Sequence, residues 1–273
     1  MYDQVKGLLR PALAQVNVGS SWADTLTADT ASAPPNCVVT LGVRSMQLAA
    51  ARAREAASWA NIPVLAVLVP HAAFKVTEGQ LPRGSSAVWL DQPTERYLNL
   101  LRVAMPTRRR VGLLLSPSSE AWVPRLEVAA IQRGLELVKA TVQSGAKDLF
   151  PALQTVLGGS DVLLALPDAA LYNTDTLQNV LIAAYRQRVP ILSYAAAHTR
   201  AGATLALHTP VEQVVGQMTS ALRALVQRKD LPDAEGPLGF GVSVNEQVAR
   251  SLGLELPAIS ALELALRRLE GRT

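Results

Sequence analysis

Short apolar runs alternate with amphipathic stretches along most of this chain. The apolar runs lack the strict alternation of a half-exposed strand, and this is typical of parallel strands buried on both faces. Between them, apolar residues recur every three or four positions, the spacing of one helix face. Strands that alternate with helices predict an α/β fold with parallel sheets. The expected strands are 37–41, 62–69, 111–115, 137–142, 162–166, 189–192 and 203–207, and the expected helices are 46–59, 94–105, 122–134, 148–157, 177–185 and 211–227.

The strand–loop–helix pattern occurs in two blocks that separate near Gln92. Each block has about 90 to 100 residues, a usual size for one compact unit. We therefore predict two Rossmann-like lobes rather than one long sheet. Residues 229–241 read as a linker rich in Pro and Gly, followed by an edge strand at 242–244 and helices at 245–251 and 259–268.

Asp168 follows the buried strand 162–166 directly, after Pro167. In open α/β sheets, ligands bind beyond the carboxyl ends of the strands, so this carboxylate would lie at the mouth of the sheet. There it would pair with a ligand ammonium or form an Asx-turn or cap for the next helix. Tyr172, Asn173 and Thr174 share the loop, where one residue would contact the ligand and another would cap the helix.

Gly42 to Ser45 opens a helix just after a strand. Free backbone N–H groups at such a helix start form an anion site that suits a carboxylate. Ser45 would add a hydroxyl donor, while Arg44 would add positive charge or face solvent. Ser116, Ser118 and Ser119 form the equivalent opening in the second block, where N-capping of the helix from Glu120 would account for one of them.

Several catalytic and cofactor motifs are missing from the sequence. The glycines of 236–241 lack the spacing of a dinucleotide-binding fingerprint, and no strand precedes them. We therefore interpret this segment as a flexible linker. No GxSxG motif is present. The histidines are His71, His198 and His208, and none has a second metal-ligating residue four positions away on a helix. His71 and His198 follow strand ends, where each side chain would either form a hydrogen bond within its loop or contact a ligand. We expect no enzyme, no cofactor and no metal site.

The formal net charge is +4 and the pI is about 9.5, yet the basic residues are scattered except for Arg108-Arg109-Arg110. With aromatic residues at 4%, the chain offers no base-stacking platform, so we expect no nucleic-acid partner. The arginine cluster is interpreted as a solvated turn, with a partner or membrane-surface patch as the alternative. Cys37 is the single cysteine of the sequence, so no internal disulfide can form. We expect its side chain to be buried as a small apolar residue.

The first residues raise the question of export. Residues 2–16 predict an amphipathic helix with no strand before it, and a doubly wound unit usually begins with a strand, so we expect a further segment upstream. The start lacks the charged and apolar regions of a signal peptide. Either the protein is cytoplasmic, or its export signal lies outside the printed sequence. No apolar run approaches the ~20 residues that span a bilayer.

The order and spacing of these motifs resemble those of ABC transporter substrate-binding proteins with a type I periplasmic-binding fold, the group of tryptophan/tyrosine-type binders. The resemblance covers nearly the whole chain. The segments that carry it are VVTLGVRSMQLA, IPVLAVLV, DQPTERYLNLLRVAMPTRRRVGLLLSPSSE, DVLLALPDAALYNTDTL, RVPILSYAAAHTRAGATLAL and VSVNEQVARSLGLELP. The chain departs from the usual pattern at Val43, where Thr or Ser often follows the glycine, and at Ala169, where Asn often follows the aspartate.

The resemblance implies two lobes that close on a small ligand, with three chain crossings between them. By analogy, residues 1–92 and 195–229 form one lobe, and residues 93–194 and 230–273 form the other. The candidate ligand-binding residues are Gly42, Arg44, Ser45, Pro70, His71, Ser116, Ser118, Asp168, Tyr172, Asn173 and Tyr194.

The resemblance also implies an extracytoplasmic solute-binding protein of an ABC-type uptake system. It would bind a small aromatic or amino-acid-like ligand and deliver it to a membrane permease, as a monomer or weak dimer. The alternative is a periplasmic sensor that binds the ligand and signals to a membrane partner without transport. A cytoplasmic core like that of LacI-type repressors is disfavoured, because the chain has no helix-turn-helix headpiece.

Overall fold

The computed structural model describes residues 35–143, 146–168 and 170–271, together with positions 4, 5, 7, 8, 11 and 12. Its contacts divide the chain into two compact units. The first unit is Met1–Asp91 with Thr209–Phe240, and the second is Gln92–His208 with Gly241–Thr273. The helix expected at 2–16 and the departure at Ala169 fall wholly or largely outside the described residues.

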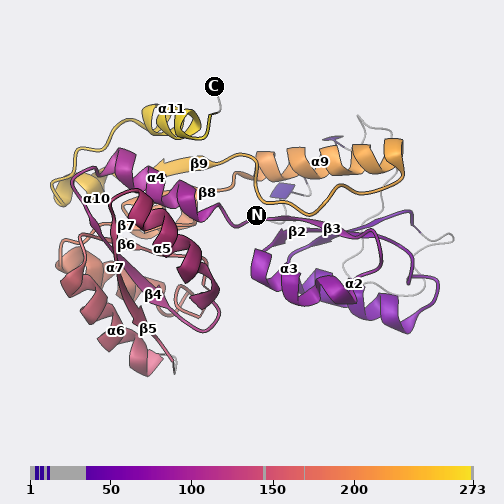
Figure 1. The fold of residues 1–273 in the computed structure, drawn as a ribbon, viewed down its shortest axis with the longest axis horizontal. Helices are drawn as coiled ribbons and strands as arrows, with labels where there is room; N and C mark the ends of the chain where they lie inside the picture. The colour runs from indigo at the N-terminus through magenta and orange to yellow at the C-terminus, as the bar shows by residue number, and fades with distance from the viewer. Residues whose placement is uncertain are drawn as a thin grey trace. The chain divides into compact units, whose positions relative to one another are not determined.

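The first unit contains a parallel sheet of strand order β1-β2-β3. Leu65 and Val67 of β2 pack with helix α9 in one apolar cluster, whereas Ala66 packs with α2 and α3 in another. The sheet is therefore covered on both faces (Figure 1). The strands are β1 Val38–Leu41, β2 Val64–Val69 and β3 Ser86–Trp89, and the helices are α2 Val43–Glu55, α3 His71–Thr77, η1 Glu78–Gln80 and α9 Val211–Arg228.

The second unit contains a sheet of order β5-β4-β6-β7-β8-β9, parallel except for the antiparallel pair β8–β9. An apolar cluster joins α6 and α7 to β4, β6 and β7. The strands are β4 Arg110–Leu115, β5 Glu136–Thr141, β6 Val162–Leu164, β7 Ile191–Ser193, β8 Leu205–His208 and β9 Gly241–Val244. The helices are α4 Thr94–Ala104, η2 Glu120–Trp122, α5 Val123–Gln132, α6 Ala146–Gly159, α7 Leu177–Arg186, α8 Ala196–Ala201, α10 Glu246–Ser251 and α11 Ile259–Leu269.

The parallel α/β architecture predicted from the sequence is confirmed, with differences in two places. Residues 70–91 contain α3 and β3, which the hydrophobic pattern did not predict, because β3 is a run of only SAVW. Residues 195–202 were expected as a loop, but Ala196–Ala201 form helix α8, whose C-cap residue Gly202 has a φ of 126°. Gly253 ends α10 with a φ of 72°, as expected for a glycine after a helix.

The boundaries of the two units differ from the expected ones at two segments. Residues 195–208 lie in the second unit, because β8 pairs with β7 and continues that sheet. Residues 230–240 lie in the first unit, where Glu235 pairs with Val88 beside β3. Sequence pattern does not show which sheet a short strand joins, since pairing is a contact between distant segments.

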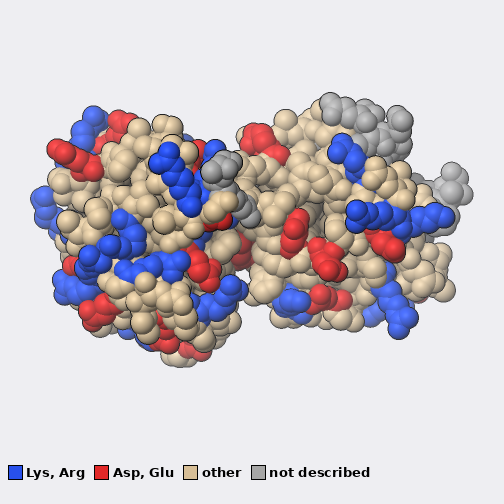
Figure 2. Space-filling model, turned by 45° about the horizontal axis from the view of Figure 1, so that its top comes forward, with Lys and Arg blue, Asp and Glu red and all other residues tan. Residues whose placement is uncertain are grey.

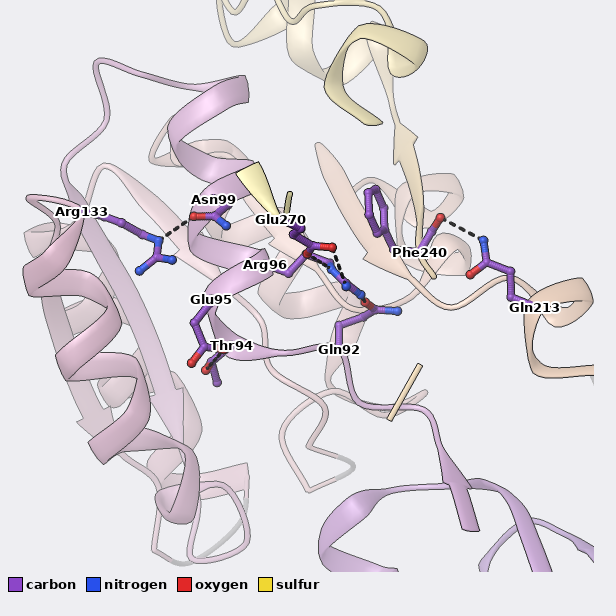
Figure 3. A network of polar contacts seen from close by, with 9 residues as sticks. All are labelled: Gln92, Thr94, Glu95, Arg96, Asn99, Arg133, Gln213, Phe240 and Glu270. Carbon is purple, nitrogen blue, oxygen red and sulfur yellow. Dashed lines mark hydrogen bonds and ion pairs between the residues drawn. The ribbon is translucent and has the colours of Figure 1, made fainter. Parts of the chain in front are cut away.

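A buried arginine of α4 forms an ion pair with the residue that follows the C-terminal helix α11. The Arg96 guanidinium donates to both carboxylate oxygens of Glu270 and to Gln92 Oε1, and Arg96 is 3% exposed (Figure 3). Leu262 and Leu266 are fully buried on the same helix. None of the helices in the described part of the chain is long and apolar enough to cross a membrane.

Candidate ligand-binding site

The second sheet reverses its strand order at β4, which has β5 on one side and β6 on the other. The crossovers from β4 to β5 and from β6 to β7 run in opposite directions, so β4 and β6 form a switch point, the place beyond whose carboxyl ends open α/β sheets bind ligands. Ser116 follows β4 directly, and Asp168 lies four residues after β6. Both side chains therefore lie where open α/β sheets bind ligands.

Asp168 is held in place from two sides. Ser116 Oγ donates to Asp168 Oδ2 at 2.6 Å, and the Ala170 N–H donates to Oδ1 at 2.9 Å. The second bond is the Asx-turn that the sequence allowed, while the first ties the loops after β4 and β6 together. Asp168 is 4% exposed, so the carboxylate is fixed and largely shielded from water.

The three serines after β4 have different roles. Ser119 Oγ accepts the Ser116 N–H at 2.8 Å and donates to the Ser116 carbonyl at 3.3 Å, which closes the loop. Ser116 Oγ lies 2.7 Å from Ser118 Oγ and also accepts the Ser118 N–H at 3.2 Å. Ser119 is buried, whereas Ser118 is exposed at the surface of the loop.

An aromatic cluster lies beside Asp168. Tyr172 and Tyr194 meet edge to face with ring centroids 6.4 Å apart, and Tyr194 meets His198 at 4.9 Å. Tyr172 is 4% exposed, and its hydroxyl has no hydrogen-bond partner among the described residues. Burial, and then the Asp168 charge, raise the pKa of both tyrosines, so both hydroxyls stay protonated. The Tyr172 O–H is thus a donor without an acceptor.

His198 and Asn173 are engaged within the fold. His198 Nδ1 lies 2.5 Å from Ser193 Oγ, and burial lowers the pKa of the imidazole. Asn173 Oδ1 accepts the N–H groups of Asp175 and Thr176 at 2.9 and 3.2 Å, which shapes the entry to α7. Asn173 thus forms a turn ahead of α7, whose N-cap residue is Thr176 and which has no side-chain cap, so the capping role expected in the 172–174 loop is not filled.

A hollow of about 250 Å³ opens beside these loops at the carboxyl ends of β4, β5 and β6. Its wall is mostly apolar, with Ser116, Ser118 and Gln143 as polar members. Val142 and Gln143, which follow β5, were not predicted from the sequence as part of a site. The lining residues are Ser116, Pro117, Ser118, Val142, Gln143, Ala170 and Leu171.

The first unit carries a second set of polar groups at the carboxyl end of β1. Gly42 has a φ of 86°, and its N–H donates to the Val67 carbonyl at 2.8 Å. Helix α2 has no side-chain cap and no acidic residue in its first turn. Arg44 is exposed and Ser45 is half-buried. This helix start has the free N–H groups expected of an anion site.

Pro70 and His71 begin α3 after β2, where Pro70 is the N-cap residue and exposed. The His71 N–H donates to Asp91 Oδ2 at 2.5 Å, and its ring lies 4.5 Å from the Trp89 ring. Burial raises the pKa of Asp91. Trp89 and Asp91 were missed in the sequence because β3 was missed; an aspartate two residues after a strand is the signal that identified Asp168.

The described part of the chain was also searched for metal sites and reactive thiols. No group of three or more His, Cys, Asp or Glu side chains that would hold a metal ion occurs there. Cys37 is half-buried, and burial raises its pKa to about 11, so the thiol stays protonated and unreactive.

Comparison with known structures shows what the fold is similar to. A ligand-free, open substrate-binding protein with adhesive properties from Clostridium difficile has a TM-score of 0.72 at 15% identity, covering 94% of this chain and 92% of that one. The ABC domain from Streptococcus pneumonia in complex with L-Trp has a TM-score of 0.66 at 15% identity, covering 96% and 94%. A conserved domain protein from Vibrio cholerae has a TM-score of 0.62 at 19% identity, covering 95% and 82%.

At these identities the likeness establishes a shared fold, and the type I periplasmic-binding fold predicted from the sequence is confirmed. No curated protein sequence matches the chain. A family model described as ABC transporter substrate binding protein matches residues 60–228, which is more than half of the 273 residues. The chain therefore belongs to the ABC transporter substrate-binding protein family.

Proposed function

We propose that this protein is the extracytoplasmic solute-binding component of an ABC-type uptake system and binds a small ligand that carries an ammonium group and an apolar or aromatic body. The proposal rests on the burial and fixed orientation of the Asp168 carboxylate. Its carboxylate is buried at the point where the second sheet reverses its strand order, and Ser116 and the Ala170 N–H orient it. A buried, oriented carboxylate is a strong partner for a ligand cation.

The groups around Asp168 support an aromatic or amino-acid-like ligand. Tyr172 and Tyr194 offer ring edges and faces for an apolar body, and the Tyr172 O–H has no acceptor among the described residues. In the first unit, the uncapped start of α2 at Gly42 to Ser45 would take a ligand carboxylate. The Streptococcus structure, whose fold this chain shares, holds L-Trp.

The family supports delivery to a membrane permease rather than catalysis. The protein would bind the solute outside the cytoplasm and release it to the permease, with no chemical change to the solute.

A thermal-shift screen of amino acids, aromatic amines and aromatic acids tests this function. A ligand at a hundred times its dissociation constant adds about 2.7 kcal/mol of stability, which corresponds to a rise of about 5–10 °C in Tm for domains of this size. We expect Asp168→Ala to abolish the rise. Asp175→Ala is the matched control, because Asp175 lies in the same loop, is exposed and carries the same charge.

Two outcomes would contradict the proposal. One is that no compound in the screen raises the Tm of the wild-type protein. The other is that Asp168→Ala and Asp175→Ala respond alike to a compound that does.

A further inference from the structure

The parallel strands of the second sheet begin along an edge that lies opposite Asp168. Helices α7 and α8 lead into β7 and β8, so their C-terminal ends lie at this edge. Helix α10 starts there as well, because it follows β9, whose Val244 pairs with Leu205 at the start of β8. Segments that are distant in the chain therefore share this edge.

Six arginines lie along this edge, which we call the arginine edge. They precede β4, β7 and β8 or lie on α10, and they are Arg108, Arg109, Arg186, Arg188, Arg200 and Arg250. Arg108 is half-buried, and the other five are exposed. Within the described residues, none of the six forms an ion pair with a carboxylate.

Two contacts fix how the arginine edge is built. Asp161 pairs with Arg110, the first residue of β4, so Arg110 adds no free charge to the edge. Arg188 Nη2 lies 3.9 Å from the point that a Cβ on Gly253 would occupy, which places the end of α7 beside the end of α10. The arginines that follow α7 and lie on α10 thus belong to one surface.

The two edges of the second sheet differ in charge. Glu120, Asp168 and Asp175 follow β4 and β6 at the carboxyl edge, and Arg125 at that edge pairs with Glu95. Carboxylates near helix starts and arginines near helix ends both suit the helix dipole, so the helices and their side chains polarise the unit in one direction.

Acidic residues near the arginine edge are fewer than its arginines. Glu136 begins β5, Glu246 begins α10, and Glu255 follows Gly253. Six arginines therefore face three carboxylates, and the edge stays positive.

The side chains of the arginine edge suit an extended layer of phosphate groups. A guanidinium binds a phosphate through two parallel hydrogen bonds. From β4 to β9 the edge crosses five neighbouring strands, about 19 Å at about 4.8 Å per strand spacing, which is too long for one phosphate ion. Tyr185, directly before Arg186, is 49% exposed. A tyrosine ring with its polar hydroxyl suits the headgroup level of a membrane.

We propose that the arginine edge docks the second unit on an anionic phospholipid surface. Phospholipid phosphates supply the charge that the six arginines lack within the fold, and Tyr185 enters the headgroup layer. Asp168 lies at the opposite edge of the same sheet, so the lipid leaves the candidate ligand site of this unit uncovered. The proposal is independent of the proposed function, and Asp168→Ala should bind lipid as the wild type does.

Co-sedimentation of the full chain with vesicles tests the docking. The protein should bind vesicles of equal parts phosphatidylcholine and phosphatidylglycerol, and should bind pure phosphatidylcholine at least about tenfold more weakly. Raising the salt from about 0.1 to 1 M shortens the screening length from about 10 to about 3 Å and should release the protein. Sodium phosphate and sodium chloride of equal ionic strength should release it equally.

Two double variants test the arginine edge at separate places. Each arginine near an anionic surface contributes about fivefold to binding. Arg186→Gln/Arg188→Gln should therefore weaken vesicle binding by about 10- to 30-fold, and Arg109→Gln/Arg250→Gln should weaken it similarly.

The matched control is Arg83→Gln/Arg223→Gln. It removes the same charge from two exposed arginines of the first unit that form no ion pair with a described residue. It should bind the anionic vesicles as the wild type does.

Several results would overturn the proposal. Equal binding to neutral and anionic vesicles would remove the role of charge, and equal weakening by the edge variants and the control would show that only net charge matters. Release by phosphate well below the matching chloride concentration would indicate a site for a single anion. Binding of duplex DNA as tight as that of the anionic vesicles would indicate a nucleic-acid partner.

Discussion

Two aspartates flank β6, and their surroundings give them different tasks. Asp161 lies at the amino end of the strand, where its Oδ2 accepts the N–H groups of Arg109 and Arg110 and its Oδ1 pairs with the Arg110 guanidinium. Asp168 lies beyond the carboxyl end and, among the described residues, accepts from Ser116 and the Ala170 N–H. An arginine therefore pairs with the first carboxylate within the fold, whereas the contacts of the second are with uncharged groups.

Asp161 should make the stability of the protein depend on pH in acid. Burial acts to raise its pKa, but the hydrogen bonds and charge of Arg110 and the N–H of Arg109 outweigh burial and hold the pKa at about 2, below the usual 3.8. The folded state therefore binds this proton less readily than the unfolded state. Its stabilising contribution is present above about pH 4 and disappears as the pH falls through 2.

Denaturant unfolding between pH 6 and pH 2 measures this effect. In the wild type, the free energy of unfolding should fall as the pH is lowered, and Asp161→Asn should reduce this fall by up to about 1 kcal/mol. The effect is limited to this size because solvent screens the pair of Asp161 and Arg110. Asp175→Asn, at an exposed aspartate, should follow the wild-type profile. Parallel profiles for wild type and Asp161→Asn would show that the contacts of Asp161 contribute nothing to folding.

At the scale of elements, α11 depends on one buried ion pair as well as on its apolar face. Arg96 near the start of α4 reaches Glu270 at the end of α11, although 174 positions separate them in the chain. Gln92, which also contacts Arg96, is the first residue of the second unit. The pair thus joins the C-terminal helix to the segment where the chain enters this unit (Figure 3).

Glu270→Ala should destabilise the protein by about 3–5 kcal/mol, because it removes the carboxylate from a buried guanidinium. The double variant Arg96→Met/Glu270→Leu should recover much of this loss, since apolar residues of similar volume often replace a buried pair without cost. The measurement is the free energy of unfolding in urea.

Arg267→Ala is the control for Glu270→Ala, because it breaks the exposed pair with Glu263 on the same helix. Exposed pairs contribute about 0–1 kcal/mol. If Glu270→Ala costs no more than Arg267→Ala, the apolar residues of α11 hold the helix in place without help from the ion pair.

At the scale of the whole molecule, each unit by itself presents polar and aromatic side chains at the carboxyl ends of its parallel strands. The first has the start of α2 with His71, Trp89 and Asp91, and the second has Asp168 with its serines and tyrosines. Figure 2 shows acidic and basic side chains interspersed over the visible face of the molecule.

A change at the start of α2 tests whether the first unit contributes to ligand binding. Ser45→Ala removes a hydroxyl from the first turn of α2 and should lower affinity by about 3- to 10-fold, the range for one hydrogen bond. Gln47→Ala, on the exposed side of the same helix, should leave affinity unchanged. Calorimetry with the strongest compound of the thermal-shift screen decides this, and a ligand insensitive to Ser45→Ala would be held without that hydroxyl.

The sequence by itself determined the α/β class, most strands and helices, and the position of Asp168. Continuous apolar runs such as Val64–Val69 predict buried parallel strands because only such strands need apolar residues on both faces. Asp168 was recognisable because a carboxylate after such a run lies at a sheet mouth whatever the rest of the fold. The family resemblance rested on the order of these same local signals.

The tertiary structure alone decided which distant segments share a sheet and which atoms meet. It placed residues 195–208 in the second unit, joined Arg96 to Glu270, and brought Ser116 to Asp168. It also revealed β3, whose four residues are too few for a pattern but pair fully with β2. Local periodicity reports how each segment is buried, whereas pairing and hydrogen bonding depend on where the other segments lie.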